Sequence, residues 1–172
     1  GTVWSLAVAA NGDLLLAGDF AVADGAVRPR FARVSTSCPA SVVTVPSGCG
    51  SVALDLSTKT LPWIGGVCRT TVTTPYNVPL IVVGTGLQGT SLPLDAVLGL
   101  PAGACTLLVL PLGIDARVPV AGRVDQQFDV PDSPAMIGTP VLQQAVALFA
   151  DASGSFTSAT ASNALVFVTG SF

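Results

Sequence analysis

Four cysteines and ten aspartates are the side chains with which this chain could do chemistry. The 172 residues include no His and no Glu, so neither a Ser-His-Asp nor a Cys-His arrangement can form. No G-x-S-x-G or H-E-x-x-H motif occurs. Four of the ten aspartates stand beside Gly, Pro or Ser, as at Asp24-Gly25 and Pro131-Asp132, which is typical of turns. The sequence therefore predicts a protein that is not an enzyme.

The cysteines indicate disulfides more than a metal site. Cys38, Cys49, Cys68 and Cys105 form no C-x-x-C motif, and no His is present to complete a zinc site. An even number of cysteines in a Thr-rich chain of low charge favours two disulfides and an oxidising compartment. We expect Cys38–Cys49, which closes a short loop, and Cys68–Cys105, which would tie two strands. The main alternative is Cys49–Cys105 with Cys38–Cys68, and free buried thiols are the other.

The sequence does not predict a calcium site or a sugar-binding site. Asp13, Asp19 and Asp24 lie close together and could supply oxygen ligands to Ca²⁺, but their spacing is not that of an EF-hand loop. We expect them at turns and hairpin edges, with no metal and no cofactor. Trp63 and Tyr76, with Trp4, could stack on a sugar; packing in a core or an interface is the expectation.

Low charge is the most unusual property of the chain. Charged residues make up 10% of it, the net charge is −3 and the mean hydropathy is +0.70, whereas ordinary domains are about 25% charged. The basic residues are scattered, apart from Arg28, Arg30 and Arg33, which argues against nucleic acid. Uncharged runs at 70–94 and 96–114 are broken by Pro and Gly, so we interpret them as buried strands and expect no membrane span.

The pattern of turns predicts an all-β protein. The 18 Gly and 13 Pro punctuate segments rich in Val, Leu and Thr, at the spacing of a β-sandwich. Asn11-Gly12 between two apolar runs predicts a hairpin. Strands are expected at 67–74, 92–98 and 164–169, among others, whereas 141–149 is compatible with a strand or a helix. We divide the chain into a hairpin segment (1–34), a disulfide-pinned connector (35–51) and an antiparallel β-sandwich (52–172).

Residues 1–34 resemble one propeller-type repeat of large secreted bacterial proteins, through the string VWSLAVAANGDLLLAGDFAVADGAVRPRFARV. Residues 38–172 resemble the C-terminal β-domain that follows such repeats, a module abundant in Planctomycetes and other environmental bacteria. The matching pieces are CPASVVTVPSGCGS, LPWIGG, LPLDAVLGLPAGACTLLV, VPDSPAMIGTPVLQQAVAL and SNALVFVTG. The resemblance implies a cell-surface or exported protein and carries no activity. One repeat cannot close a propeller, because each blade needs neighbours to bury its faces.

These observations favour an extracellular structural protein, a self-assembling subunit of a surface layer or filament. The low charge suits surfaces that neighbouring copies cover. The alternative is a terminal anchoring or adhesive domain of a larger secreted repeat protein, with a cell-surface or carbohydrate partner. The chain begins at Gly1 rather than Met, so we expect a processed chain or a fragment. The predicted assembly interface is an apolar set on the N-terminal hairpin: Val3, Trp4, Leu6, Val8, Leu14, Leu16 and Phe20.

Overall fold

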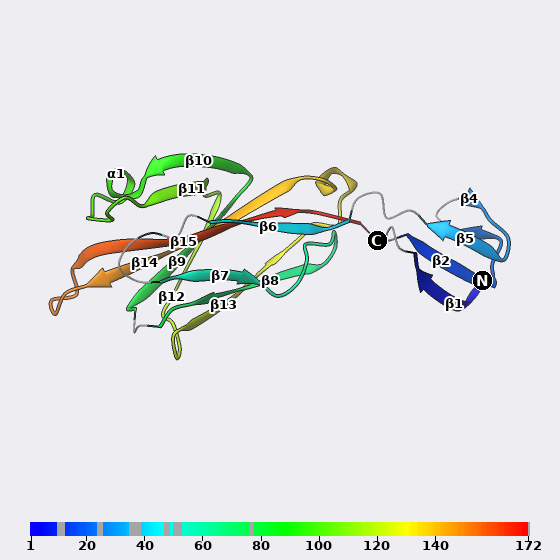
Figure 1. Ribbon diagram of the computed structural model, residues 1–172, viewed down its shortest axis with the longest axis horizontal. Coiled ribbons are helices and arrows are strands. Elements are labelled where there is room, and N and C mark those ends of the chain that lie inside the picture. Colours follow the sequence, from blue (N-terminus) through cyan, green and yellow to red (C-terminus); the bar gives the residue numbers. More distant parts are fainter. Residues whose placement is uncertain are drawn as a thin grey trace. The chain divides into compact units, whose positions relative to one another are not determined.

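The computed structural model describes residues 1–9, 13–23, 26–34, 39–46, 49, 53–75 and 78–171. The chain forms two compact units, one of Gly1–Pro39 with Ser171–Phe172 and one of Ala40–Gly170. Both are built from antiparallel strands, which confirms the predicted all-β class (Figure 1). The predicted Asn11-Gly12 turn and Cys38 lie outside the described residues.

The first unit is a single small sheet. Its strands are β1 (Thr2–Val8), β2 (Leu14–Asp19) and β5 (Phe31–Val34), in the order β1-β2-β5, and β3 (Val22–Ala23) pairs with β4 (Ala26–Val27). The pairing of β1 with β2 shifts between Val3 and Ser5, which leaves Trp4 as a bulge residue. A Cβ at Gly18 would lie 2.1 Å from the carbonyl oxygen of Thr2, so only glycine permits this close approach.

The second unit is a layered sandwich (Figure 1). Its central sheet has the order β12-β9-β14-β15-β6, and a second sheet has the order β13-β8-β7. A hairpin of β10 and β11 covers the other face of the central sheet. The strands are β6 (Ser41–Val45), β7 (Asp55–Thr58), β8 (Val67–Thr73), β9 (Leu80–Gly86), β10 (Gln88–Pro93), β11 (Thr106–Leu110), β12 (Gly113–Arg117), β13 (Arg123–Asp129), β14 (Pro140–Ala150) and β15 (Phe156–Val168).

Helical turns are short in this unit. They are α1 (Leu94–Leu98) and the 3-10 turn η1 (Pro134–Met136). The predicted strand 92–98 is therefore wrong beyond Pro93, because the chain turns at Leu94 to bury that side chain and ends the turn at Gly99 with φ 65°. The segment 141–149 is a strand, β14. The predicted connector 35–51 contains β6, whose Ser41–Val45 pairs with β15 as an edge strand of the sandwich.

Strand β14 shows why both faces of the central sheet are buried. Ala145 and Ala147 pack in the core between the two sheets, with Ile81, Leu165 and Phe167. Val146, the residue between them, packs in a second core under the β10–β11 hairpin. Alternate side chains of a strand point to opposite faces, so one strand serves two cores.

A bulge in β15 changes which residues face which core. Gln144 pairs with Ala164 and Val146 with Ala161, so Ala145 alone lies opposite Ser162 and Asn163. The hydroxyl of Ser162 accepts a hydrogen bond from the Ala145 N–H at 3.0 Å and so replaces the ladder bond that the bulge removes. Before the bulge, the odd-numbered Ala159 and Ala161 face the hairpin; after it, the odd-numbered Leu165 and Phe167 face the other sheet.

The bulge also gives Asn163 a role at the edge of the second sheet. Its Oδ1 accepts a hydrogen bond from the N–H of Leu56, and its Nδ2 donates one to the carbonyl of the same residue, both at 2.8 Å. Leu56 lies in β7, at the end of the order β13-β8-β7. The carboxamide thus satisfies the donor and acceptor that a neighbouring strand would satisfy.

We predict that Asn163→Leu, which keeps the side chain's approximate size, lowers the free energy of unfolding by about 2 kcal/mol, because the buried backbone groups of Leu56 lose their partners. Urea denaturation measures this value. Gln88→Leu, at an exposed position of β10, serves as the control and is expected to stay within about 0.5 kcal/mol. Equal stability of the Asn163→Leu variant and the native chain would contradict the role given to Asn163.

A charged cluster lies across β8 and β13. Asp125 accepts hydrogen bonds from Arg123 Nη2 at 2.8 Å, Thr71 Oγ1 at 2.6 Å and Lys59 Nζ at 3.2 Å. These donors, Arg123 first, hold the pKa of the Asp125 carboxyl well below its usual value. The ionised form is therefore favoured in the folded chain, and its stabilising effect is lost as the pH falls through the lowered pKa.

We predict that Asp125→Asn lowers the Tm at pH 7 by a small amount, on the order of a few degrees. The difference from the native chain should shrink as the pH falls below about 4, the usual carboxyl range, because Asp125 of the unfolded chain then takes up a proton while Asp125 of the folded chain, with its lowered pKa, stays ionised. Circular dichroism melts over this pH range provide the measurement. About 0.5 M NaCl at pH 7 should also reduce the difference. A difference that is the same at every pH would argue against the ionic role.

Candidate assembly interface

The register of the first unit brings most of the predicted interface onto one sheet face. Val3 lies opposite Gly18, Leu6 opposite Leu16, and Val8 opposite Leu14. Leu16 and Leu14 in turn lie opposite Ala32 and Val34 of β5. Directly opposite residues share a face. We call this surface the apolar face, and its residues are Val3, Leu6, Val8, Leu14, Leu16, Ala32 and Val34.

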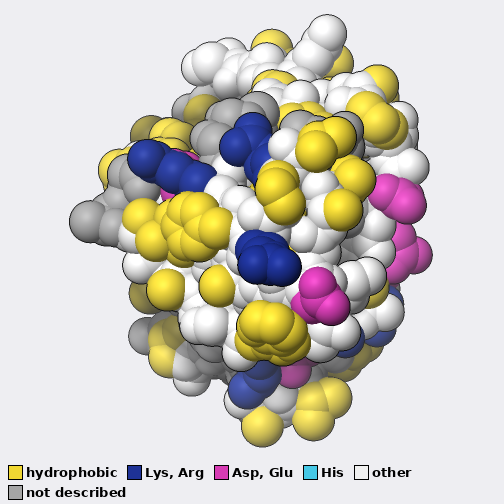
Figure 2. Space-filling model, turned by 90° about the vertical axis from the view of Figure 1, so that its right-hand side faces the viewer, with side chains coloured by type: hydrophobic (Ala, Val, Ile, Leu, Met, Phe, Trp, Pro, Cys, Tyr) yellow, Lys and Arg dark blue, Asp and Glu magenta, His cyan; other side chains and the backbone are white. Residues whose placement is uncertain are grey.

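The β1 side of the apolar face is open to solvent. The exposed fractions of Val3, Leu6 and Val8 are 50%, 60% and 66%. Leu14 and Leu16, in the middle strand, are half-buried. Isolated exposed apolar side chains are common in this protein: Figure 2 shows them in separate groups, with Lys and Arg side chains between them. What distinguishes the apolar face is that its members are cross-strand neighbours without a charge among them.

Two residues of the predicted interface lie elsewhere. Trp4 is the bulge residue of β1 and is 73% exposed, so the alternative expectation of a core position for it was wrong. Phe20 follows the end of β2 and is half-buried. A bulge residue cannot be recognised from apolar residue type, which is why the sequence grouped Trp4 with the others.

The opposite face of this sheet is mixed in character. It carries Ser5, Ala7, Leu15 and Arg33, together with the exposed Phe31. Arg33 Nε donates to Asp13 Oδ2 at 2.5 Å. Asp13, one of the three candidate calcium ligands and the residue before β2, therefore forms an ion pair with Arg33 of β5. Within the described residues no group of three or more acidic, His or Cys side chains could hold a metal ion.

The cysteines pair differently from the favoured prediction. Cys49 is joined to Cys105, with a Cα–Cα distance of 5.1 Å, so Cys38–Cys49 and Cys68–Cys105 are wrong. Cys68 is a free, buried thiol, and Cys38 lies outside the described residues. The favoured pairing fails because the central sheet separates Cys68 from Cys105. Cys68 packs in the core between the two sheets, whereas Cys105 packs in the core on the other side of the central sheet.

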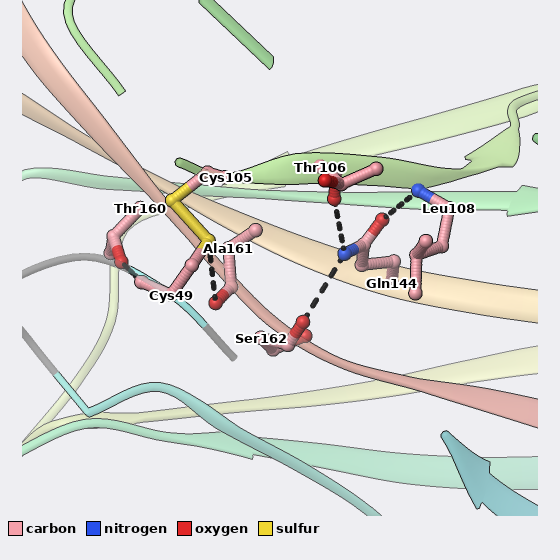
Figure 3. The surroundings of a disulfide bond; sticks show 8 residues. All are labelled: Cys49, Cys105, Thr106, Leu108, Gln144, Thr160, Ala161 and Ser162. Atoms are coloured by element: carbon pink, nitrogen blue, oxygen red, sulfur yellow. Dashed lines mark hydrogen bonds between the residues drawn. A yellow bond between two sulfur atoms is a disulfide. The ribbon is translucent and has the colours of Figure 1, made fainter. Parts of the chain in front are cut away.

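The disulfide fastens the β10–β11 hairpin to the central sheet (Figure 3). Cys49 forms an isolated bridge with Ala161 of β15, and Cys105 directly precedes β11. The hydroxyl of Thr160 donates to the carbonyl of Cys49. Sequence spacing could not select this pair, because the two cysteines are 56 residues apart. Cys49 lies near Cys105 because it is bridged to Ala161 of β15.

Gln144 provides a second attachment for the hairpin (Figure 3). Its Oε1 accepts a hydrogen bond from the N–H of Leu108 at 2.7 Å, and its Nε2 donates to the carbonyl of Thr106 at 3.1 Å. The same Nε2 donates to the carbonyl of Ser162 at 3.2 Å. Gln144 is buried. Its carboxamide hydrogen-bonds to the backbone of β11, as the carboxamide of Asn163 hydrogen-bonds to the backbone of β7. In the sequence, the pair Gln143-Gln144 inside an apolar run is the feature that could have indicated this buried hydrogen-bonding position.

In comparisons with known proteins, no family model, no curated protein and no solved structure matches the chain. Among the described residues, no helix has both the length and the apolar character that a membrane crossing requires. The disulfide is compatible with an oxidising, extracellular environment.

We predict that proteolytic peptides mapped without reduction contain Cys49 linked to Cys105 and an unlinked Cys68. Burial raises the pKa of Cys68 to about 11, so only about one thiol in a thousand is ionised at pH 8. Iodoacetamide at that pH should therefore leave Cys68 unmodified in the folded chain and modify it in 6 M guanidinium. A Cys68–Cys105 linked peptide, or rapid modification of folded Cys68, would contradict this assignment.

Proposed function

We propose that the protein is an extracellular structural subunit that assembles with copies of itself, through docking of the N-terminal sheet of one chain onto the next. The observation that carries the proposal is the apolar face, because Leu6 and Val8 lie opposite Leu16 and Leu14, and both are exposed together with Val3 on the same face. Strand β1 is also at the end of its sheet order, so its outer edge can pair with another strand.

The energy of such a contact comes from two sources. Burial of apolar area contributes about 25 cal/mol per Å², so three partly exposed aliphatic side chains give only a few kcal/mol. Association costs at least about 4 kcal/mol in lost translational and rotational freedom. Main-chain hydrogen bonds along β1 and repetition of the contact along a fibre would supply the rest. A head-to-tail contact that does not close into a ring produces a filament.

The composition and the disulfide agree with this role. A surface with few charges is suited to being covered by neighbouring copies, and the Cys49–Cys105 disulfide suits an oxidising surrounding. The resemblance of residues 1–34 to a propeller repeat supports the same reading, since such a repeat requires a neighbour on its faces.

A second candidate function is a terminal adhesive domain of a larger secreted protein. The specific observation in its favour is Trp4, whose ring is 73% exposed and could stack on a sugar ring. Glycan-array binding that disappears in Trp4→Ala, in a chain that does not self-associate, would support adhesion over assembly.

The test compares two substitutions of equally exposed residues on opposite faces of one sheet. Leu6 and Phe31 are each 60% exposed. We predict that the native chain forms fibres or sheets in negative-stain electron microscopy, and that Leu6→Asp gives monomers of about 17 kDa by light scattering, because the buried charge has no partner. Phe31→Asp should still assemble. Melting curves establish that both variants are folded.

A monomeric native chain at high concentration would overturn the proposal. So would equal loss of assembly in both variants, because loss at either face would show that the apolar face has no special role.

A further inference from the structure

A groove lies between the inner faces of the two sheets of the sandwich, beside the edge strands β12 and β13. Its volume is about 520 Å³, within the usual range of ligand sites. Val83 and Val141 line it from the central sheet, Phe128 from β13, and Met136 from η1. Strands β12 and β13, which border it, are each at the end of a sheet order. In the described part of the chain their outer edges thus have no strand beside them.

Two buried carboxamides in the groove have atoms without a hydrogen-bond partner. Gln143 is 2% exposed; its Nε2 donates to Thr85 Oγ1 at 3.2 Å, but its Oε1 accepts nothing. Gln126 is 7% exposed, and its Nε2 has no acceptor. Both side chains line the groove. A buried polar atom without a partner is destabilising, so a molecule in the groove that hydrogen-bonded to these two atoms would remove that cost.

The charges of the groove select against anions. Its charged lining residues are Asp115 and Asp129, and no Lys or Arg lines it. Asp115 is paired with Arg117 at 2.9 Å. A ligand with a carboxylate or phosphate would meet the aspartates without a compensating cation in the lining. An uncharged, largely apolar ligand that carries both a hydrogen-bond donor and an acceptor fits these walls.

The same domain shows what such carboxamides bind. Gln144 holds β11 by one N–H and one carbonyl, and Asn163 holds Leu56 of β7 in the same way. In both cases the partner is the edge of a strand, whose N–H and C=O groups point outward together. Gln126 and Gln143 present the same chemical groups, with no strand edge on them.

We propose that this groove receives an edge strand, and that the strand is β1 of a second copy of the chain. This inference rests on the proposed function, and it names the surface on the neighbouring copy that accepts the N-terminal sheet. Strand β1 has the sequence TVWSLAV, without a charge, and every one of its side chains is exposed. It is at the end of its sheet order, and its outer N–H and C=O groups would pair with Gln143 Oε1 and Gln126 Nε2 after these two buried carboxamides rotate toward the groove.

The probe is a fluorescently labelled peptide, TVWSLAV, with a blocked C-terminus, titrated into the full chain and followed by fluorescence anisotropy. We expect saturable binding. Gln126→Leu combined with Gln143→Leu should weaken it at least tenfold, because the peptide N–H and C=O would lose their partners. The Tm of this variant should stay close to that of the native chain, because each replaced carboxamide has an unpartnered atom, while Gln143→Leu also loses the hydrogen bond to Thr85 Oγ1. Gln126→Leu alone tests the same point if the double variant does not fold.

Two controls separate groove binding from general stickiness. Gln88→Leu adds the same apolar group at an exposed position outside the groove lining and should bind the peptide like the native chain. The peptide TVWPLPV lacks two N–H donors and cannot continue a strand, so it should not bind.

The outcomes distinguish this inference from the proposed function. Assembly of the native chain with no peptide binding, or with binding unchanged in both Gln126→Leu variants, would overturn the groove as the acceptor and leave self-assembly standing. Peptide binding that depends on Gln126 and Gln143, in a chain that remains monomeric, would support the groove as a strand site and reject self-assembly.

Discussion

The central sheet of the sandwich has to bury both of its faces, and most of the unit follows from that constraint. Strand β14 sends Ala145 and Ala147 to one core and Val146 to the other. A sheet with two apolar faces needs a layer on each side. The β13-β8-β7 sheet forms one of these layers, and the β10–β11 hairpin forms the other. The disulfide and Gln144 both attach the smaller layer, the β10–β11 hairpin, to the central sheet.

A narrow covering layer has strand edges whose backbone groups are not paired with a neighbouring strand. In this protein, side-chain carboxamides hydrogen-bond to two such edges. Gln144 satisfies β11 and Asn163 satisfies β7, each with one donated and one accepted hydrogen bond to backbone. A buried amide side chain has the same polar groups as a peptide bond, so it can end a sheet where another strand would not fit. The bulge at Ser162 and Asn163 makes this possible, because it turns Asn163 toward β7 while Ala161 still faces the hairpin.

The first unit presents the contrasting case of a sheet whose apolar face is still half open. Leu14 and Leu16 are half-buried in the middle strand, but Leu6 and Val8 on β1 remain exposed. The groove in the second unit has the complementary property of buried polar atoms without partners. Exposed apolar area and unsatisfied buried amides are both relieved by association, so the proposed contact between copies removes two costs in one step.

The sequence by itself determined the class of this protein. Regularly spaced Gly, Pro and Asn turns between runs of Val, Leu and Thr specified antiparallel strands, because turn chemistry and β-propensity act locally. Apolar residue type on the predicted hairpin also grouped Leu6, Val8, Leu14 and Leu16 as one set. It could not separate Trp4 from them, since a bulge depends on the close approach of Thr2 to Gly18 across the sheet.

Only the tertiary structure decided the cysteine pairing and the roles of the amides. Cys68 and Cys105 lie in cores on opposite sides of the central sheet, a separation that sequence distance does not encode. Gln143 and Gln144 are neighbours in sequence, yet one faces the groove and the other binds β11. Whether a buried carboxamide has a partner depends on which backbone edges the packed sheets bring to it, and those contacts form between segments far apart in the chain.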